Sequence, residues 1–431
     1  MSLRRAFASR SSLFYGGLLG FLGGNVLLRL LYRLVPRLQT SPTTSWSKME
    51  KHSHVARVLP PALAQPLIAD SVCDLVGHTP LVRIQSLSEA TGCDILAKAE
   101  FLNPAGSTKD RVALAMIQEG EKNGTLVPGT ASTIFEGTVG STGISLATLA
   151  RSRGYGCHIV MPDDQAKEKY ELLERLGATV EKVRPASIVD SNHFVHVAKR
   201  RAKEFDAASR RAYREAGGKD ERYARGYFAD QFENLTNHHA HARTTAPEIW
   251  AQTSGRLDAF VAGSGTGGTI GGVGSYLKSQ APNVRVILAD PQGSGLYNRV
   301  RHGIFYAPQE QEGTRKRHQV DTVVEGVGNN RMTGNFALGE VHIDQAIRVS
   351  DAEAVRMARW LSHKDGIFIG SSSAVNCVAA LRVARSLGPG HRIVTLLCDS
   401  GHRHLTKFWD DEYLKAHGLD PSIPRNLAFV A

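Results

Sequence analysis

Short apolar runs alternate with longer segments in which apolar residues recur at helical spacing, from near Ile68 onward. Each apolar run predicts a strand, and helical patterns lie between most of them, as over Thr142–Arg153 and Gln165–Leu176. The predicted strands are Ile95–Ala99, Thr133–Phe135, His158–Met161, Thr179–Val183, Ala259–Ala262, Arg285–Ala289, Thr322–Val324 and Ile393–Leu397. Because strands that alternate with helices form mostly parallel sheets covered by those helices, the pattern predicts an α/β fold.

The start of the chain has a different composition. Residues 11–28 carry no charge and are mostly apolar or small, arginines flank them, and the first 49 residues contain no acidic side chain. Such a run is just long enough to span a membrane, and an acid-free, arginine-bearing start is also typical of mitochondrial targeting. We therefore predict a mitochondrial membrane anchor over residues 1–38, with the outer membrane favoured and a cleaved presequence as the alternative. Residues 39–67, rich in Ser, Thr, Pro and His, form the predicted linker.

Charge and cysteine content exclude several classes of protein. The net charge is +11, and seven of these charges lie in the first 49 residues, so the remainder is only mildly basic and no nucleic-acid partner is expected. The five cysteines are scattered without a Cys-x-x-Cys pair, and the histidines of residues 238–241 lack carboxylates at ligand spacing. We predict neither a disulfide framework nor a metal site. Residues 199–227 are highly charged and predict a surface helix followed by a loop, a solvated insertion rather than a docking surface.

One lysine is a candidate nucleophile. Lys109 follows a Pro/Gly/Ser turn within residues 103–111, Asn-Pro-Ala-Gly-Ser-Thr-Lys-Asp-Arg, and a helix is predicted over Arg111–Glu119. A lysine held at a buried helix start has a lowered pKa and can act as an amine nucleophile. Taken alone, these nine residues favour a helix cap with a solvated lysine. The segments that follow in the chain favour the nucleophile.

Three further segments join a predicted strand or turn to a helix. Residues 136–143, Glu-Gly-Thr-Val-Gly-Ser-Thr-Gly, place free N–H donors at a helix start, which suits a substrate carboxylate. Residues 262–269, Ala-Gly-Ser-Gly-Thr-Gly-Gly-Thr, are small enough for the backbone to wrap a phosphate. Residues 368–374, Phe-Ile-Gly-Ser-Ser-Ser-Ala, offer a hydroxyl that can hydrogen-bond a ring nitrogen. Each segment, taken alone, is also compatible with an ordinary turn or helix cap.

The phosphate segment has a competing interpretation. Gly263, Gly265 and Gly268 satisfy the pattern Gly-x-Gly-x-x-Gly, and Asp290 follows the next strand at the spacing of a ribose-binding acid. That combination alone indicates a nicotinamide or flavin enzyme. A dehydrogenase, however, has no obvious use for the Lys109 segment. A lysine followed by an anion loop, a phosphate loop and a late serine turn is the layout of a pyridoxal phosphate enzyme.

From Val76 to His404 the chain resembles the cysteine synthase and cystathionine β-synthase family, the fold type II pyridoxal phosphate enzymes. The matching segments are residues 77–82 (Gly-His-Thr-Pro-Leu-Val), 103–111, 244–250 (Thr-Thr-Ala-Pro-Glu-Ile-Trp) and 263–269. The resemblance implies an α/β fold with two domains, each with a mostly parallel sheet flanked by helices. A cofactor-binding domain would comprise residues 68–100 and 236–415, and a smaller mobile substrate domain residues 101–235.

The same resemblance implies the chemistry. Pyridoxal 5′-phosphate is the expected cofactor, an amino acid and sulfide are the expected partners, and the expected assembly is a homodimer. The expected reaction is the formation of L-cysteine from O-acetyl-L-serine and sulfide, with sulfide release from cysteine, or another β-elimination or replacement on a serine derivative, as the alternative. A catalytically inactive scaffold is a third hypothesis. Within the family, the N-terminal segment and residues 140–145 resemble the fungal mitochondrial type.

The resemblance also assigns roles to residues. Lys109 would hold the cofactor as a Schiff base and act as the general base, and Ser372 would face the ring nitrogen, with Ser371 or Ser373 as alternative registers. The phosphate would lie on Gly265, Thr266, Gly267, Gly268 and Thr269. The substrate carboxylate would be bound by Thr138, Val139, Gly140 and Thr142 with help from Gln231, and Ser141 would lie near the cofactor ring.

Two positions in this loop depart from the family pattern. The usual sequence is Thr-Ser-Gly-Asn-Thr-Gly, and here Val139 replaces the serine and Ser141 the asparagine. Further along, the segment 325–332 leaves the usual pattern after Gly328, where Arg331 is a candidate substrate contact. These differences make the choice of substrate the open question of the sequence.

Overall fold

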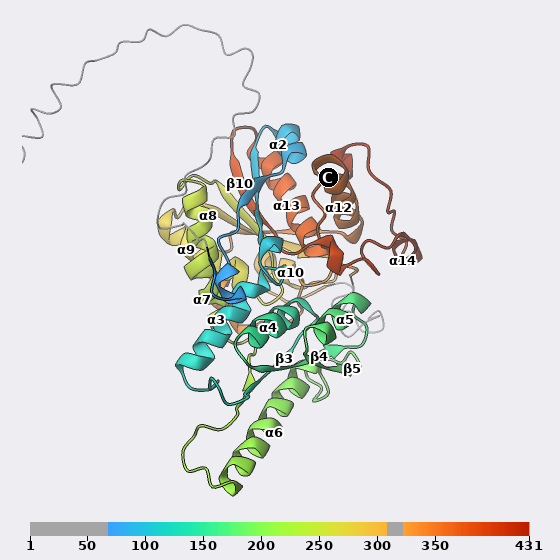
Figure 1. The fold of residues 1–431 in the computed structure, drawn as a ribbon. Helices are drawn as coiled ribbons and strands as arrows, with labels where there is room; N and C mark the ends of the chain where they lie inside the picture. Colours follow the sequence, from blue (N-terminus) through green and yellow to red (C-terminus); the bar gives the residue numbers. More distant parts are fainter. Residues whose placement is uncertain (1–67, 308–321, 431) are drawn as a thin grey trace, which may run out of the picture. The chain divides into compact units, whose positions relative to one another are not determined.

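Two sheets organise the computed structural model, which describes residues 68–307 and 322–430 (Figure 1). The larger sheet has six strands in the order β1-β2-β10-β7-β8-β9, and only the β1–β2 pairing is antiparallel. Its strands are β1 (Leu81–Arg83), β2 (Asp94–Ala99), β10 (Arg392–Leu397), β7 (Ala259–Gly263), β8 (Arg285–Pro291) and β9 (Gln345–Val349). The smaller sheet is parallel throughout and comprises β5 (Thr179–Val183), β4 (Gly156–Pro162), β3 (Thr133–Gly137) and β6 (Gly226–Phe228), in that order. The predicted α/β fold with mostly parallel sheets is therefore confirmed.

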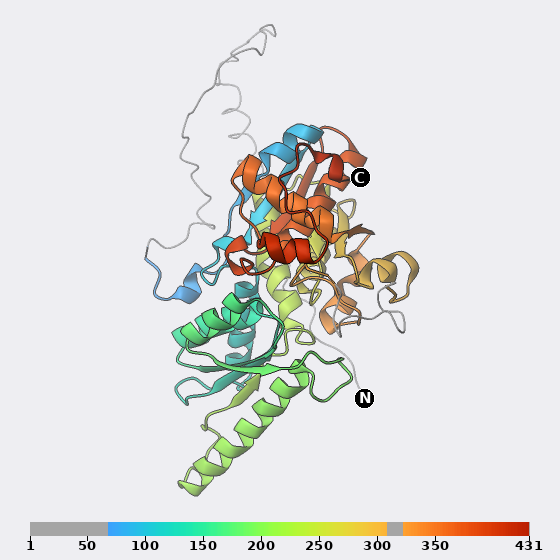
Figure 2. The ribbon, with the colours of Figure 1, turned by 90° about the vertical axis from the view of Figure 1, so that its right-hand side faces the viewer.

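Helices cover both sheets. Helices α4 and α5 lie on one face of the smaller sheet and α6 lies on the other (Figures 1 and 2). The helices are α2 (Gln85–Thr91), α3 (Lys109–Lys122), α4 (Ser141–Ser152), α5 (Lys167–Arg175), α6 (Phe194–Glu215), α7 (Thr236–Ala240), α8 (Ala246–Gln252), α9 (Gly268–Gln280), α10 (Leu296–His302), α11 (Gly334–Gly339), α12 (Asp351–Asp365), α13 (Ser371–Leu387) and α14 (Asp411–Ala416). A π-helical turn, His241–Thr245, joins α7 to α8.

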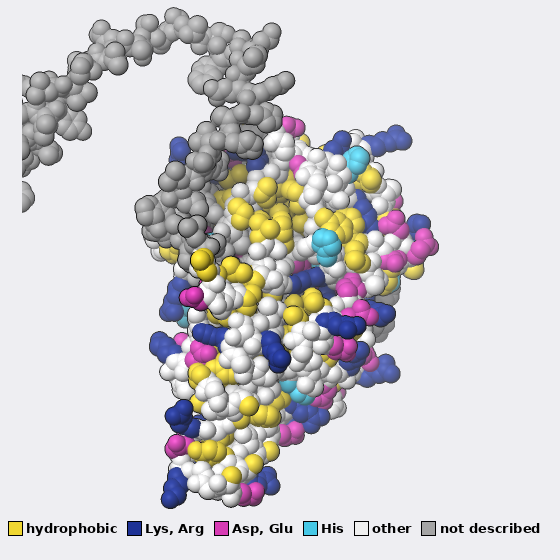
Figure 3. All heavy atoms as spheres, in the orientation of Figure 1, with side chains coloured by type: hydrophobic (Ala, Val, Ile, Leu, Met, Phe, Trp, Pro, Cys, Tyr) yellow, Lys and Arg dark blue, Asp and Glu magenta, His cyan; other side chains and the backbone are white. Residues whose placement is uncertain are grey.

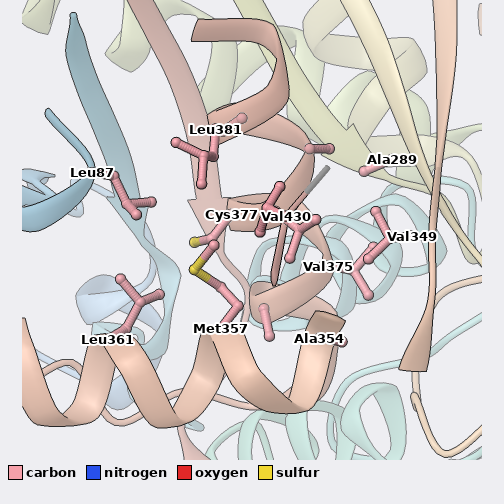
Figure 4. Close-up of a cluster of buried hydrophobic side chains, with 14 of the residues drawn as sticks. Leu87, Ala289, Val349, Ala354, Met357, Leu361, Val375, Cys377, Leu381 and Val430 are labelled. Carbon is pink, nitrogen blue, oxygen red and sulfur yellow. The ribbon is translucent and has the colours of Figure 1, made fainter. Parts of the chain in front are cut away.

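Each sheet has its own apolar core. Helix α13 packs against the larger sheet and α12 packs on α13, through buried side chains such as Met357, Leu361 and Cys377 (Figure 4). Under the smaller sheet, Met116 of α3 and Leu149 of α4 belong to a separate buried cluster with Ile159 of β4. Burying an aliphatic side chain of this size contributes about 1.5–3 kcal/mol. The strands that contribute to these two cores carry, at their carboxyl ends, the loops described below.

Several predictions of elements differ from the structure. Thr322–Val324 is not a strand, because its polar groups bond to the start of α12: Val323 N–H donates to Asp351 at 2.9 Å and the Thr322 hydroxyl also donates to that carboxylate. Strands β1, β6 and β9 were not predicted. The charged helix predicted within residues 199–227 is confirmed as most of α6, followed by a turn and the start of β6.

The predicted division into two domains remains a prediction, although each sheet draws its strands from one side of the predicted boundaries. In the part of the chain that the structure describes, no helix combines the length and the apolar character needed to cross a bilayer. The predicted anchor over residues 1–38 and the linker over residues 39–67 lie outside the described residues.

Candidate active site

A cavity of about 290 Å³ lies where the carboxyl ends of strands from both sheets meet. Strand β3 leads into Thr138, β7 into the glycine-rich loop that starts at Gly263, and β10 into Cys398, and all three positions line the cavity. Ligands of open parallel sheets bind outside the carboxyl ends of the strands, because helix N-termini and loops gather there. This position makes the cavity the candidate active site.

Lys109 is the first residue of α3 and lines this cavity. The turn before it is fixed to β10, since Thr108 N–H donates to the Cys398 carbonyl at 3.0 Å. Burial lowers the pKa of Lys109, against the attraction of Cys398, Asp399 and Glu100. Lys109 has no ion-pair partner among the described residues. Its amine is therefore accessible from the cavity and easier to deprotonate than that of a surface lysine.

A buried ion network fixes the start of α3. Arg111 contacts Glu100 at 2.8 Å and Glu248 of α8 at 2.6 Å, and Lys98 contacts the other oxygen of Glu248 at 2.6 Å. The Thr79 hydroxyl donates to Glu100 at 2.6 Å. Three of the segments that carry the family resemblance, 77–82, 103–111 and 244–250, therefore meet in one network beneath Lys109. This network positions helix α3, which carries Lys109 at its first residue.

The carboxylate loop lies on the opposite wall, at the N-terminus of α4. Thr138, Val139, Ser141 and Thr142 line the cavity together with Gln231, whereas Gly140 does not. The Thr142 hydroxyl donates to the Gln231 side chain at 2.6 Å, and the Gln231 amide donates to the Gly137 carbonyl at 3.1 Å. Gly140 has a φ of 137°, and a Cβ there would lie 2.6 Å from Lys169 Cδ. Glycine is therefore required at this position for both conformation and space.

The phosphate loop joins β7 to α9. Gly265, Thr266, Gly267 and Thr269 line the cavity, and Gly268 is turned toward Asn237 instead. A Cβ on Gly265 would lie 2.5 Å from the Gly326 carbonyl oxygen, and a Cβ on Gly267 would lie 2.5 Å from the backbone of Phe336. The backbone therefore closes tightly around this end of the cavity. The first N–H groups of α9 have no carbonyl partner within the helix, which suits a phosphate.

The structure distinguishes the three serines at the start of α13. The Ser371 hydroxyl accepts from Glu325 N–H at 2.9 Å, and the Ser373 hydroxyl accepts from Cys398 N–H at 2.8 Å. Only Ser372 of the three lines the cavity. The geometry therefore favours Ser372 as the residue that faces a ring nitrogen.

A pyridoxal phosphate fits these residues. The amine of Lys109, the glycine cradle at α9 and the Ser372 hydroxyl lie around one cavity. The buried hydroxyl of Thr108 also lines it and has no hydrogen-bond partner among the described residues. A cofactor that carries both a phosphate and an aldehyde would contact the cradle through the phosphate and the lysine through the aldehyde.

A second ion network, which no sequence motif indicated, lies in the cavity wall. Lys169 of α5 pairs with Glu325, and His404 lies between Glu325 and Asp399, with its Nε2 3.0 Å from Asp399 and its Nδ1 3.5 Å from Glu325. Burial opposes the charge of Glu325, but Lys169 and His404 hold the pKa of that carboxyl well below its usual range. Three segments that are far apart in the sequence, around residues 169, 325 and 399–404, supply these side chains, so no local motif could have revealed them.

Asp290 and His241, which belong to the competing interpretations, do not line the cavity. Asp290, the candidate ribose acid, is fully buried, accepts from Tyr297 N–H at 2.7 Å and does not line the cavity. Burial raises the pKa of Asp290 to about 7. His241 lies between the hydroxyls of Thr245 and Thr269, at 2.9 and 3.1 Å. Arg331 lines the cavity but is paired with Glu233 at 2.6 Å.

Comparison with known proteins agrees with this geometry. Residues 72–399 match the family described as pyridoxal-phosphate dependent enzyme. The chain is 58% identical over 363 residues to "Cysteine synthase 2" of Schizosaccharomyces pombe, which covers 84% of this chain and 89% of that protein. It is 54% identical over 347 residues to "Putative mitochondrial cysteine synthase" of Saccharomyces cerevisiae, covering 80% and 85%.

A solved structure is similar as well. The O-acetylserine dependent cystathionine beta-synthase from Helicobacter pylori shares 31% identity and a TM-score of 0.63, over 79% of this chain and 99% of that chain. The family match covers most of the chain. It includes Lys109, the carboxylate loop, the phosphate loop and the serines at the start of α13. The chain therefore belongs to the family of pyridoxal-phosphate dependent enzymes.

Proposed function

We propose that this chain makes L-cysteine from O-acetyl-L-serine and sulfide, with pyridoxal 5′-phosphate as its cofactor. The observation that carries the proposal is that an unpaired lysine, a carboxylate loop and a phosphate cradle surround one cavity. The names of the similar proteins, two of them cysteine synthases and one an O-acetylserine dependent enzyme, support the same substrate class.

Each wall of the cavity has a distinct task in this reaction. Lys109 holds the cofactor, and Gly265–Thr269 bind its phosphate through the backbone N–H groups at the start of α9. The N-terminus of α4 and the Thr142–Gln231 pair bind the substrate carboxylate. Bound in this position, the cofactor withdraws electrons from the substrate Cα.

Proton transfer falls to the lysine. Once the substrate amine has displaced it from the cofactor, Lys109, with its pKa lowered by burial, would take the Cα proton as acetate leaves Cβ, and would return a proton to Cα after sulfide has bonded to Cβ. O-acetyl-L-serine and hydrogen sulfide thereby give L-cysteine and acetate, with no change in redox state. Ser372 holds the ring nitrogen by a hydrogen bond without giving it a full proton, which disfavours racemisation and transamination.

The test compares two reactions of the purified holoenzyme. We expect cysteine to form from O-acetyl-L-serine and sulfide, with sulfide release from cysteine much slower. Sulfide release without any cysteine synthesis would replace the synthase by a desulfhydrase, and the absence of both reactions in a yellow, cofactor-loaded protein would favour an inactive scaffold.

Location and assembly form part of the proposal. The uncharged segment 11–28 and the name of the Saccharomyces relative support a mitochondrial protein anchored by one N-terminal span, with the outer membrane favoured. We expect the chain to remain in the membrane pellet after alkaline carbonate extraction of isolated mitochondria, and release into the supernatant would contradict the anchor. A homodimer is the expected assembly, and light scattering of the detergent-solubilised chain measures it.

A further inference from the structure

A second cavity lies outside the active site. It is a groove of about 920 Å³ between α6, the start of β6 and the turn that follows α3. We call it the basic groove, because six cations line it together with a single carboxylate, Asp206. The cations are Lys199, Lys203, Arg210, Arg211, Arg214 and Arg225.

The sequence of α6 places these cations on one face. Lys199, Lys203, Arg210 and Arg214 follow one another at intervals of four, seven and four residues, so they project from the same side of the helix. The first turns of α6 bury apolar side chains against the smaller sheet, whereas its C-terminal half is mostly exposed. That end of the helix extends past the strands (Figures 1 and 2), and both basic and acidic side chains lie on the surface around it (Figure 3).

Most of this positive charge is not neutralised. Lys199, Lys203 and Arg211 form no ion pair with any described residue. The three other arginines share one carboxylate: Glu221 contacts Arg214 at 2.6 Å, Arg210 at 3.3 Å and Arg225 at 3.6 Å. Like charges one helical turn apart destabilise a helix, and among the described residues Asp206 and Glu221 compensate for only part of this stripe.

We propose that the basic groove binds an acidic segment of a partner protein. Arginines already hold a carboxylate there, and arginine–carboxylate pairs are the strong, geometrically specific contacts of such interfaces. A flat lipid surface does not reach the floor of a groove. The chain's own residues 1–67 contain one acidic residue, Glu50, and so do not supply the acidic segment.

Glu221 would compete with the partner for the arginines of the basic groove. It holds the arginines in position when the groove is free, and a carboxylate of the partner takes its place on binding. Removing the charge of Glu221 therefore makes three arginines available to the partner. This effect distinguishes a carboxylate-binding groove from a merely solvated helix.

The experiment measures binding of a fluorescein-labelled poly-glutamate peptide to the holoenzyme by anisotropy. We expect binding that weakens with rising salt, and a loss of about tenfold or more in the double variant Lys203→Glu/Arg211→Glu, whose positions are exposed. The matched control Arg200→Glu/Arg151→Glu changes the net charge equally at exposed positions outside the groove, and we expect a change below about twofold. We expect Glu221→Gln to tighten binding.

Four outcomes would overturn the proposal: equal weakening in the control variant, equal binding of a poly-glutamine peptide, unchanged or weaker binding by Glu221→Gln, or binding of phosphatidylserine vesicles or single-stranded DNA in preference to the peptide. Cysteine synthesis by the variants does not enter the test, so the groove and the proposed enzyme activity succeed or fail independently.

Discussion

Lys109 and Lys169 both line the cavity and differ in their partners. Lys169 is paired with Glu325, whereas Lys109 has no ion-pair partner among the described residues and burial lowers its pKa. Only an uncharged amine attacks an aldehyde. We therefore expect borohydride reduction of the holoenzyme, followed by peptide mapping, to place the cofactor adduct on Lys109. An adduct on Lys169, or on none, would contradict the assignment, and Lys109→Ala is expected to lose the visible absorption band of the bound cofactor.

The charge of His404 stabilises the fold, and this stabilisation is lost at alkaline pH. Burial opposes its charge, but Asp399 and Glu325 outweigh burial and raise the pKa of His404 from 6.5 to about 9. The stabilisation is complete below about pH 6.5 and disappears as pH rises through about 9. We expect the free energy of unfolding to fall by up to about 3 kcal/mol between about pH 7 and about pH 10. Denaturant titration measures this, and His404→Gln should lower stability and flatten the decline; an equally steep decline in the variant would exclude His404 as its cause.

The residues that could be predicted from the sequence are those whose chemistry is local. Glycines and hydroxyls cluster at Thr138–Thr142 and Gly265–Thr269, and a strand before and a helix after each cluster indicate an anion site. The ion network of Lys169, Glu325 and His404 has no such local pattern, because each charge has the appearance of an ordinary surface residue in its own segment. Only the folded chain brings them together.

Among the elements, helix α3 depends on the buried network around Arg111. Replacing Arg111 by Met leaves Glu100 and Glu248 buried without that partner, and breaking a buried pair from one side costs about 3–5 kcal/mol. We expect Arg111→Met to lower the free energy of unfolding by this amount and to weaken cofactor binding, because Lys109 lies two residues away. A suitable control is Glu121→Gln on the same helix, which removes a half-buried pair with Arg153 and should cost less than about 1 kcal/mol. Equal effects of the two variants would contradict a special role for the buried network.

Among the elements, the sequence pattern predicted one strand that the structure lacks and missed three that it contains. Thr322–Val324 has the β-branched composition of a strand, yet Asp351 at the start of α12 satisfies its polar groups, so the segment needs no partner strand. Strand β9 was missed because Gln345 and Arg348 interrupt its apolar pattern, although Ala346 and Val349 are buried. Strands β1 and β6 are three residues each, too short for a periodic pattern to identify. Buried central strands such as β7 and β8 were predicted correctly because they are apolar on both faces.

At the scale of the whole molecule, Lys169 connects the two sheets across the cavity. It belongs to α5, beside the smaller sheet, and its partner Glu325 precedes the glycine segment that packs on the phosphate loop of the larger sheet. Its aliphatic stem also supports Gly140, and its ammonium lies 3.5 Å from the Val139 carbonyl. Removing this charge would therefore loosen the carboxylate loop while leaving the phosphate cradle intact.

Lys169 should therefore affect substrate binding without affecting cofactor binding. We expect Lys169→Met to raise KM for the amino-acid substrate by about tenfold, equivalent to about 1.4 kcal/mol of lost binding, while cofactor occupancy stays complete. Lys167→Met on the same helix is the matched control, because Lys167 is exposed and pairs, among the residues that the structure describes, only with Glu171 one turn away, and it should leave KM unchanged. Steady-state kinetics together with the absorbance of the bound cofactor measure both quantities. A loss of cofactor from Lys169→Met, or an equal rise of KM in the control, would show that the ion pair stabilises the fold in general rather than positioning the loop that binds the carboxylate.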